Sequence, residues 1–164
     1  MASSDLFTTT GAIFSPCRTW RYLWWVRWAE GPMLYGLCLN PSYADEQRRD
    51  NTVTQMMRRA KALGFAGFAM LNAFAYVSTN PKGLLTCADP VGPENDATIL
   101  EHAQRAGMVI CGWGNSSPLI AARAAHIRKM LAGVPLHYLI LTKDGQPHHP
   151  LRIGYEVQPK EWKI

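Results

Sequence analysis

Four short apolar segments, each followed by a polar turn, recur along the middle of the chain. They are Leu34 to Leu39, Phe65 to Leu71, Met108 to Cys111, and His137 to Leu141. Each is shorter than an ordinary helix and has the apolar character of a strand buried on both faces. Stretches with helical spacing of apolar residues separate them, so strands and helices alternate. This alternation predicts an α/β fold with a mostly parallel sheet.

The helical stretches have recognisable ends. Thr52 to Leu63 carries apolar residues at helical spacing and is closed by Gly64. Glu94 to Ala106 begins with acidic residues, which complement a helix dipole. A third helix follows a cap at Ser116 or Ser117 and runs to about Ala132. We therefore expect a three-layer α/β/α domain, with helices on both faces of a four-stranded, mostly parallel sheet.

The two ends of the chain are less regular than its middle. We expect residues 1–17 to be a flexible lead-in and residues 18–164 to be one domain, which suits a chain of 164 residues. Trp20 to Trp28 is rich in aromatic residues, and Ala29-Glu30-Gly31-Pro32 separates it from the first central strand. This pattern predicts an N-terminal antiparallel hairpin strand. The tail up to Ile164 is a candidate edge strand.

Composition restricts the class of protein. The chain is 48% hydrophobic and 18% charged, as is usual for globular proteins. Its four cysteines form no CxxC pair, and no segment reaches the ~20 apolar residues of a membrane span. We expect a cytoplasmic monomer with reduced thiols and without a metal ion or cofactor. The net charge of +5 suits a polyanionic partner but is also common in proteins that bind none.

The polar turns after the four apolar segments are the candidate functional site, because ligands of α/β sheets gather beyond the carboxyl ends of parallel strands. The turns contain LNPS, LNAF, GWGN and HHPL, and they include Asn40, Asn72, Trp113 and His149. A plain structural explanation stays open for each. A turn asparagine can bond its own backbone, and a histidine can be satisfied inside a core.

In this order and at this spacing, the four turns resemble the motifs of the uracil-DNA glycosylase superfamily, over about residues 33–155. Enzymes of this superfamily flip a base out of DNA and hydrolyse its bond to the sugar. The whole chain also resembles a bacterial and phage domain family of unknown function, through NPS-x-A-D, a following D-x-T, N-x-F, W-G and G-x-P-x-H-P-L. The second resemblance assigns no activity.

The glycosylase resemblance implies a role for each motif. Asn40 would orient the attacking water, and Asn72 would read the edge of the flipped base with its amide donor and acceptor. His149 would donate to the base oxygen as the base leaves as an anion. The Trp113 turn would be more architectural than chemical. Candidates for DNA-phosphate contacts are Ser116 and Ser117 at a helix amino end, together with Arg48, Arg49 and Arg152.

The aromatic residue that the resemblance implies for base stacking is missing after the first motif, where Asp50-Asn51-Thr52 stands instead. Tyr43, Phe74 or Trp113 would have to stack. Ser42 stands where uracil-specific enzymes carry a tyrosine that blocks a 5-substituent, so the resemblance implies room for a pyrimidine with a bulky 5-group.

Asp45 and Asp50 are a further departure from the glycosylase pattern, in the loop that would roof the site. Because the amide of Asn40 cannot act as a general base near neutral pH, either carboxylate is a candidate for that role. These carboxylates help to distinguish the alternatives, because a protein that binds nucleic acid without hydrolysis does not need a carboxylate over the sugar.

Together these features predict a DNA glycosylase that excises a 5-substituted pyrimidine and leaves an abasic site. The loop from Ala75 to Pro93 offers the polar groups of Tyr76, Ser78, Thr79 and Asn80. They would suit the hydroxymethyl or sugar adducts of hypermodified phage DNA, and hence a role in defence. Two alternatives stay open: a nucleic-acid or nucleotide binding module without hydrolysis, and a hydrolase of free modified nucleosides or nucleotides.

Overall fold

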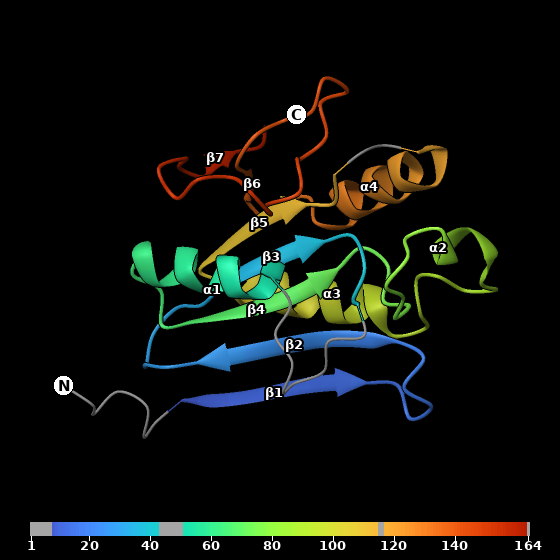
Figure 1. Cartoon of the computed structure of the whole chain (residues 1–164), viewed down its shortest axis with the longest axis horizontal. Helices are drawn as coiled ribbons and strands as arrows, with labels where there is room; N and C mark the ends of the chain where they lie inside the picture. The colour runs from blue at the N-terminus through green and yellow to red at the C-terminus, as the bar shows by residue number, and fades with distance from the viewer. Residues whose placement is uncertain (1–7, 43–50, 115–116, 164) are drawn as a thin grey trace.

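A mixed sheet of seven strands runs through the centre of the computed structural model, which describes residues 8–42, 51–114 and 117–163 (Figure 1). The strand order is β1-β2-β4-β3-β5-β6-β7. The central parallel strands are β4 (Gly67–Asn72), β3 (Leu34–Cys38), β5 (Met108–Gly112) and β6 (Leu136–Tyr138). These correspond to the four predicted strands. β7 (Lys160–Glu161) pairs antiparallel with β6, which confirms an edge strand in the tail.

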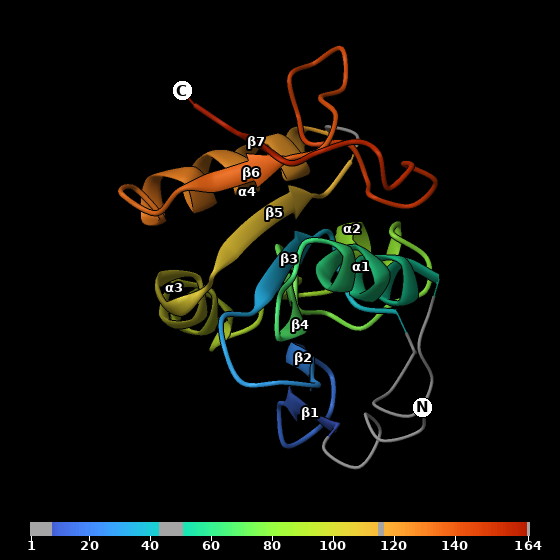
Figure 2. The same ribbon diagram turned by 90° about the vertical axis from the view of Figure 1, so that its left-hand side faces the viewer.

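Helices cover both faces of the sheet. α1 (Asn51–Ala62) lies on one face, and α3 (Asn95–Arg105) and α4 (Pro118–Met130) lie on the other (Figure 2). The short α2 (Gly83–Thr86) belongs to the long connection after β4. Alternate residues of each strand serve the two faces, so Leu34 packs in the core under α1 and Tyr35 in the core under α3 and α4. Of the helices in the described part of the chain, none has the length and apolar character needed to span a bilayer.

The N-terminal strands differ from the predicted hairpin. β2 (Arg21–Arg27) pairs antiparallel with β4 rather than with β3, because β4 lies between them. β1 (Thr9–Phe14) pairs antiparallel with β2, so the expected lead-in over residues 1–17 contains a strand. β1 is an exposed edge strand with little apolar patterning, and its pairing depends mainly on main-chain hydrogen bonds. The sheet is therefore larger than the expected four strands.

The carboxyl ends of three central strands are level with one another. Cys38 of β3 pairs with Asn72 of β4 on one side and with Gly112 of β5 on the other. The segments after β3 and β4 remain hydrogen-bonded to each other beyond the strands, because Ala73 N donates to Cys38 O over 2.8 Å. The segments that follow β3, β4 and β5 thus meet at one edge of the sheet.

A β-bulge interrupts β2 beside this edge. Ile13 pairs with Leu23 and Phe14 pairs with Arg21, so Tyr22 is an extra residue on β2. Because side chains alternate between faces, one extra residue changes the face to which Arg21 belongs. Arg21 thereby joins the α1 side of the sheet, where Trp24 is also buried.

Candidate functional site

A cavity of about 210 Å³ lies at the carboxyl edge of the sheet, beside the first turn of α1. Six residues that the sequence analysis selected line it: Asn40 and Ser42 after β3, Asn72 at the end of β4, Ser78 and Thr79 in the connection that follows, and His149 in the segment after β6. The structure therefore brings together residues that are far apart in the chain. Their convergence follows from the level ends of the parallel strands.

Asn72 is the most enclosed polar residue of the cavity lining, with 2% of its surface exposed. Its side-chain nitrogen Nδ2 is buried and makes no hydrogen bond to any described residue. Leaving a buried donor unpaired costs about 1–3 kcal/mol, a penalty that a bound acceptor would remove. The Nδ2 donor is thus not bonded to its own turn, in contrast to the plain structural explanation.

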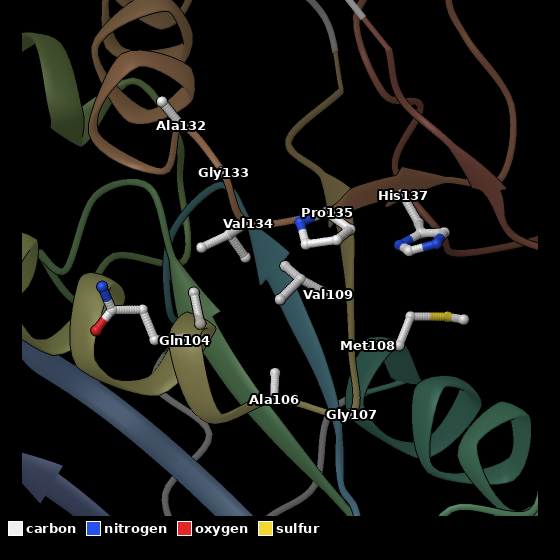
Figure 3. A pocket seen from close by; sticks show the side chains of 11 residues that line it. Gln104, Ala106, Gly107, Met108, Val109, Ala132, Gly133, Val134, Pro135 and His137 are labelled. Carbon is white, nitrogen blue, oxygen red and sulfur yellow. The ribbon is translucent and has the colours of Figure 1, made fainter.

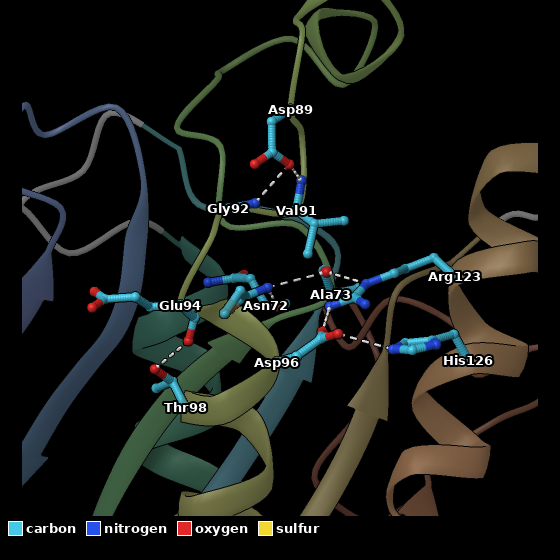
Figure 4. A network of polar contacts seen from close by, with 11 residues as sticks. Asn72, Ala73, Asp89, Val91, Gly92, Glu94, Asp96, Thr98, Arg123 and His126 are labelled. Carbon is cyan, nitrogen blue, oxygen red and sulfur yellow. Dashed lines mark hydrogen bonds and ion pairs between the residues drawn. The ribbon is translucent and has the colours of Figure 1, made fainter.

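The main chain around Asn72 is held from the opposite face of the sheet (Figure 4). Asn95 Nδ2 donates to Asn72 O over 3.0 Å and to Ala73 O over 3.2 Å. Arg123 Nε donates to Ala73 O over 2.7 Å. Asn95 and Arg123 are both buried, so these bonds fix the turn that presents Asn72 to the cavity.

Asp96 anchors the arginine of this network. Its carboxylate lies 2.6 Å from Arg123 Nη2 and 2.9 Å from His126 Nε2. Burial alone would raise the pKa of Asp96, but the hydrogen bonds from Arg123 and then His126 outweigh it and hold the pKa below its ordinary value. Asp96 is therefore ionised at neutral pH and keeps Arg123 in place.

The orientation of the Asn40 amide follows from its neighbours. Nδ2 donates to Ser78 O over 2.8 Å and to Pro41 O over 3.1 Å. Because both partners are carbonyl oxygens, the nitrogen must face them and Oδ1 must face the other way. An amide oxygen can accept a hydrogen from water and so orient it, but it cannot remove a proton at neutral pH.

The tautomer of His149 follows from its contact with the main chain. Nδ1 accepts a hydrogen bond from Leu151 N over 3.2 Å. A ring nitrogen that accepts carries no proton, so Nε2 carries the hydrogen in the neutral ring. His149, which lines the cavity, can thus donate a hydrogen bond through Nε2 without being charged.

The turn after β5 docks the segment that carries His149. Gly114 N donates to Pro147 O over 2.9 Å, and Trp113 Nε1 donates to Gln146 Oε1 over 2.8 Å. At Gly112 a Cβ would lie 2.7 Å from Pro150 Cδ, so glycine permits the close approach of the two segments. The turn thus helps to hold the segment that carries His149 against the end of β5.

Arg59 of α1 holds the chain that follows His149. Its guanidinium is buried and donates to the carbonyl oxygens of Val157, Ile153 and Gly154 over 2.8, 3.0 and 3.1 Å. Burial lowers the pKa of Arg59 from its ordinary value. These bonds fasten the C-terminal segment to α1, the helix that borders the cavity.

Phe74 and Trp113 do not line the cavity. Both belong to the core beneath α3 and α4, with 1% and 2% of their surfaces exposed, and Trp113 packs against Trp162. The structure does not bring either ring to the face on which Asn72 lies. The expectation that one of these two stacks on a bound base therefore loses its geometric basis.

The candidate phosphate contacts have different surroundings. Ser117 caps α4, since its Oγ accepts from Ile120 N over 3.3 Å. Arg152 is exposed and tied to α1, because its N donates to Gln55 Oε1 over 3.1 Å. The remaining predicted site residues lie outside the described part of the chain: Tyr43, Asp45, Arg48, Arg49, Asp50 and Ser116.

Arg21 and the first turn of α1 were not selected from the sequence. Arg21 is 3% exposed and lines the cavity, as do Thr52 and Val53 of α1. None of the described lining residues is acidic. In the sequence, Arg21 is only one arginine within an aromatic segment. The face of the sheet to which its side chain belongs depends on the bulge at Tyr22.

A larger cavity, about 420 Å³ in volume, lies at the amino ends of β5 and β6 (Figure 3). Its lining is mostly small and apolar, with Gln104 and His137 as its polar side chains. No residue that the sequence analysis selected lines it. Within the described ranges, no three His, Cys, Asp or Glu side chains gather closely enough to hold a metal ion.

Residues 21–151 match a family model described as "Protein of unknown function (DUF1643)". The chain belongs to this family. The DUF1643 match begins at Arg21 and extends past His149, so it covers every described residue that lines the smaller cavity. Searches of the curated proteins and of the solved structures found no match.

Proposed function

We propose that this DUF1643 protein is a DNA glycosylase that flips a 5-substituted pyrimidine out of DNA and hydrolyses its N-glycosidic bond, leaving an abasic site. The observation that carries the proposal is the buried amide of Asn72, whose Nδ2 has no partner among the described residues and which lines the cavity. A side-chain amide offers both a donor and an acceptor, which match the paired groups on the edge of a pyrimidine.

The other lining residues suit the chemistry of base release. Breaking the bond from C1′ to the base nitrogen builds positive charge on the sugar and negative charge on the base. Nε2 of His149 donates to the departing base, and Oδ1 of Asn40 orients the water that adds to C1′. Asp45 or Asp50 would accept the proton of that water, and both lie outside the described residues.

The size of the cavity supports a single flipped base as the ligand. Its volume of about 210 Å³ is below the roughly 300–1,000 Å³ of pockets that enclose drug-sized molecules. Ser42 lines the cavity with a small side chain, and Ser78 and Thr79 contribute polar groups. These residues would face a 5-substituent of the base, such as a hydroxymethyl group.

Hypermodified pyrimidines of phage DNA are the substrates that we favour, and a cytoplasmic role in defence follows from them. The protein would act as a monomer on double- or single-stranded DNA. Its net charge of +5 supports a polyanionic partner.

A second candidate function is a nucleic-acid or nucleotide binding module that does not hydrolyse. Its support is that Asn40, the lining residue that would meet the water, cannot act as a general base, and that binding needs none. The same cavity would then recognise a modified base without cleaving its bond.

The test incubates the protein with DNAs that carry different modified pyrimidines and assays abasic sites by alkaline cleavage. We expect cleavage by the native protein and its loss in Asn72→Ala, with general DNA affinity preserved and recognition weakened by about 1–3 kcal/mol. Gln104→Ala is the matched control, because Gln104 is an exposed amide on α3 and lies outside the lining. Binding without abasic sites would favour the binding module, and full activity of Asn72→Ala would exclude the proposed base contact.

A further inference from the structure

We propose that an apolar groove between α2 and the amino end of α4 binds the nucleotide next to the flipped one, with its base against Leu85 and its phosphate at Lys82. The inference rests on the proposed function in one respect, which is that a pyrimidine of DNA occupies the cavity beside Asn72. It extends the ligand from one base to a dinucleotide.

The groove adjoins the cavity that contains Asn72. Its volume is about 180 Å³, and it lies where α2 faces the beginning of α4 (Figure 1). Two residues, Leu39 and Pro81, line both the groove and the cavity. The two hollows therefore share a wall, and consecutive nucleotides of one strand can occupy them together.

Leu85 is held in an exposed position beside the groove. It is 67% exposed, more than any other large apolar side chain of the described residues, whereas its neighbour Leu84 is 4% exposed and anchors α2 in the core. The turn before α2 is held by its own hydrogen bonds, since Ser78 Oγ donates to Asn80 O over 2.7 Å and Lys82 N donates to Asn80 Oδ1 over 3.0 Å. A flat base that covers Leu85 would remove this apolar surface from water.

The charge at the groove favours an occupant with an anionic group. Lys82 lines the groove, and its ammonium forms no ion pair with a described residue. The 13-residue helix α4 begins at Pro118, so the positive end of its dipole also lies here. None of the described residues that line the groove is acidic. A nucleotide combines an apolar base face with a phosphate, and so matches both properties of the groove better than an apolar protein segment does.

The groove has few groups that could distinguish one base from another. Among the described lining residues, Lys82 and Ser117 are the polar ones, and Ser117 Oγ already accepts from Ile120 N over 3.3 Å. The remaining side chains are leucine, isoleucine and proline, which contact the face of a base without hydrogen bonds. The neighbouring nucleotide therefore adds affinity whatever its base, and base selectivity comes from the cavity.

Isothermal titration with thymidine dinucleotides tests the proposal. The probes are TpT and the two dinucleotides in which a tetrahydrofuran residue without a base replaces the 5′ or the 3′ thymidine. We expect TpT to bind about tenfold more tightly than either, because only TpT has a second base to cover Leu85. Leu85→Ser should remove this advantage and Leu85→Met should keep it. Lys82→Gln should weaken TpT and one of the base-free dinucleotides, which shows whether the neighbour is the 5′ or the 3′ nucleotide.

Ile13→Ser and Lys129→Gln are the matched controls. Ile13 is 45% exposed on β1, at the edge of the sheet formed by that strand, and Lys129 is exposed near the carboxyl end of α4. Both variants should bind the three probes as the native protein does.

Equal affinity of the native protein for the three dinucleotides, or no binding of TpT, would overturn the proposal without reference to any variant. Sedimentation of the native protein and Leu85→Ser examines another occupant. Self-association that Leu85→Ser abolishes, with unchanged binding of TpT, would assign the groove to a second copy of the chain and also overturn the proposal. Abasic sites in modified DNA without an advantage of TpT would leave the proposed function standing and refute the groove. An advantage that depends on Leu85, without abasic sites in any DNA, would do the reverse.

Discussion

The side-chain amide of Asn95, on α3, donates to the main-chain carbonyl of Asn72, at the end of β4, over 3.0 Å. Asn95 is completely buried on the face of the sheet opposite the cavity. The residue that we propose to read the base is thus held in position by a residue that cannot touch the base.

Replacing Asn95 with Ala should weaken both folding and the site. The carbonyls of Asn72 and Ala73 would lose a buried donor, so we expect the free energy of unfolding to fall by about 1–3 kcal/mol. Chemical denaturation measures this change, and kcat measured separately from KM shows whether the misplaced amide of Asn72 slows excision. Glu101→Gln is the control, because its ion pair with Arg105 is exposed and should contribute less than about 1 kcal/mol. Equal losses in the two variants would contradict the proposed positioning role.

Replacing His149 with Ala should remove the donor that meets the departing base. Loss of one such donor commonly lowers kcat by roughly 10²–10³-fold. Single-turnover excision assays measure the effect apart from product release. His148→Ala should retain activity, since His148 is exposed and outside the lining. A His149 variant as fast as the native protein would show that leaving-group stabilisation comes from elsewhere.

Replacing Ser42 with Tyr should restrict the size of the accepted base. Ser42 lines the cavity, so a large ring at this position would occupy the space of a 5-substituent. We expect action on the bulky base to be suppressed while any trace activity on uracil remains. Competition in one reaction between a DNA with the bulky base and a DNA with uracil gives the ratio of the two excision rates directly. If the native protein prefers uracil in ordinary DNA, the assigned substrate class is wrong.

Replacing Arg152 with Gln should change how DNA binding depends on salt. Binding through phosphates releases counterions, so the logarithm of affinity falls linearly with the logarithm of salt concentration. Removal of one phosphate contact reduces that slope by about 1. Fluorescence anisotropy across a salt series measures the slope, and Lys129→Gln on α4, on the opposite face from α1, should leave it unchanged. A flat response of the native protein would favour free nucleosides as ligands.

Cys17 should be the most reactive thiol of the folded protein. Hydrogen bonds with Ser15 and then with Thr19 favour its thiolate and lower its pKa to about 7, whereas burial raises the pKa of Cys111. Alkylation by iodoacetamide should therefore rise with pH to half its limit at about pH 7, because the thiolate is the reactive form. Mass spectrometry locates the label, and Ser15→Ala should shift the midpoint to higher pH. A midpoint unchanged by that substitution would rule out the hydrogen bond as the cause.

The sequence indicated the central strands because their apolar runs are continuous, and parallel strand ends explain why Asn40, Asn72 and His149 reach one cavity. β1 was not predicted, because an edge strand that is held by main-chain hydrogen bonds needs no apolar pattern in its sequence. Arg21 could not be assigned to the site, since its face depends on one extra residue in β2. Phe74 was one of three candidates for stacking on the base because the usual aromatic residue is missing, yet its ring packs in the core under α3 and α4.

The cavity draws its lining from Arg21, Asn40, Asn72 and His149, which are widely separated along the chain. No short fragment can therefore contain the cavity, and the unfolded chain has no counterpart of it. A compound that fits the cavity binds only the native state. Such a compound stabilises the fold by mass action, by about 2.7 kcal/mol at a concentration of one hundred times its Kd. A screen that records the rise in Tm would consequently identify occupants of the cavity before any reaction has been observed.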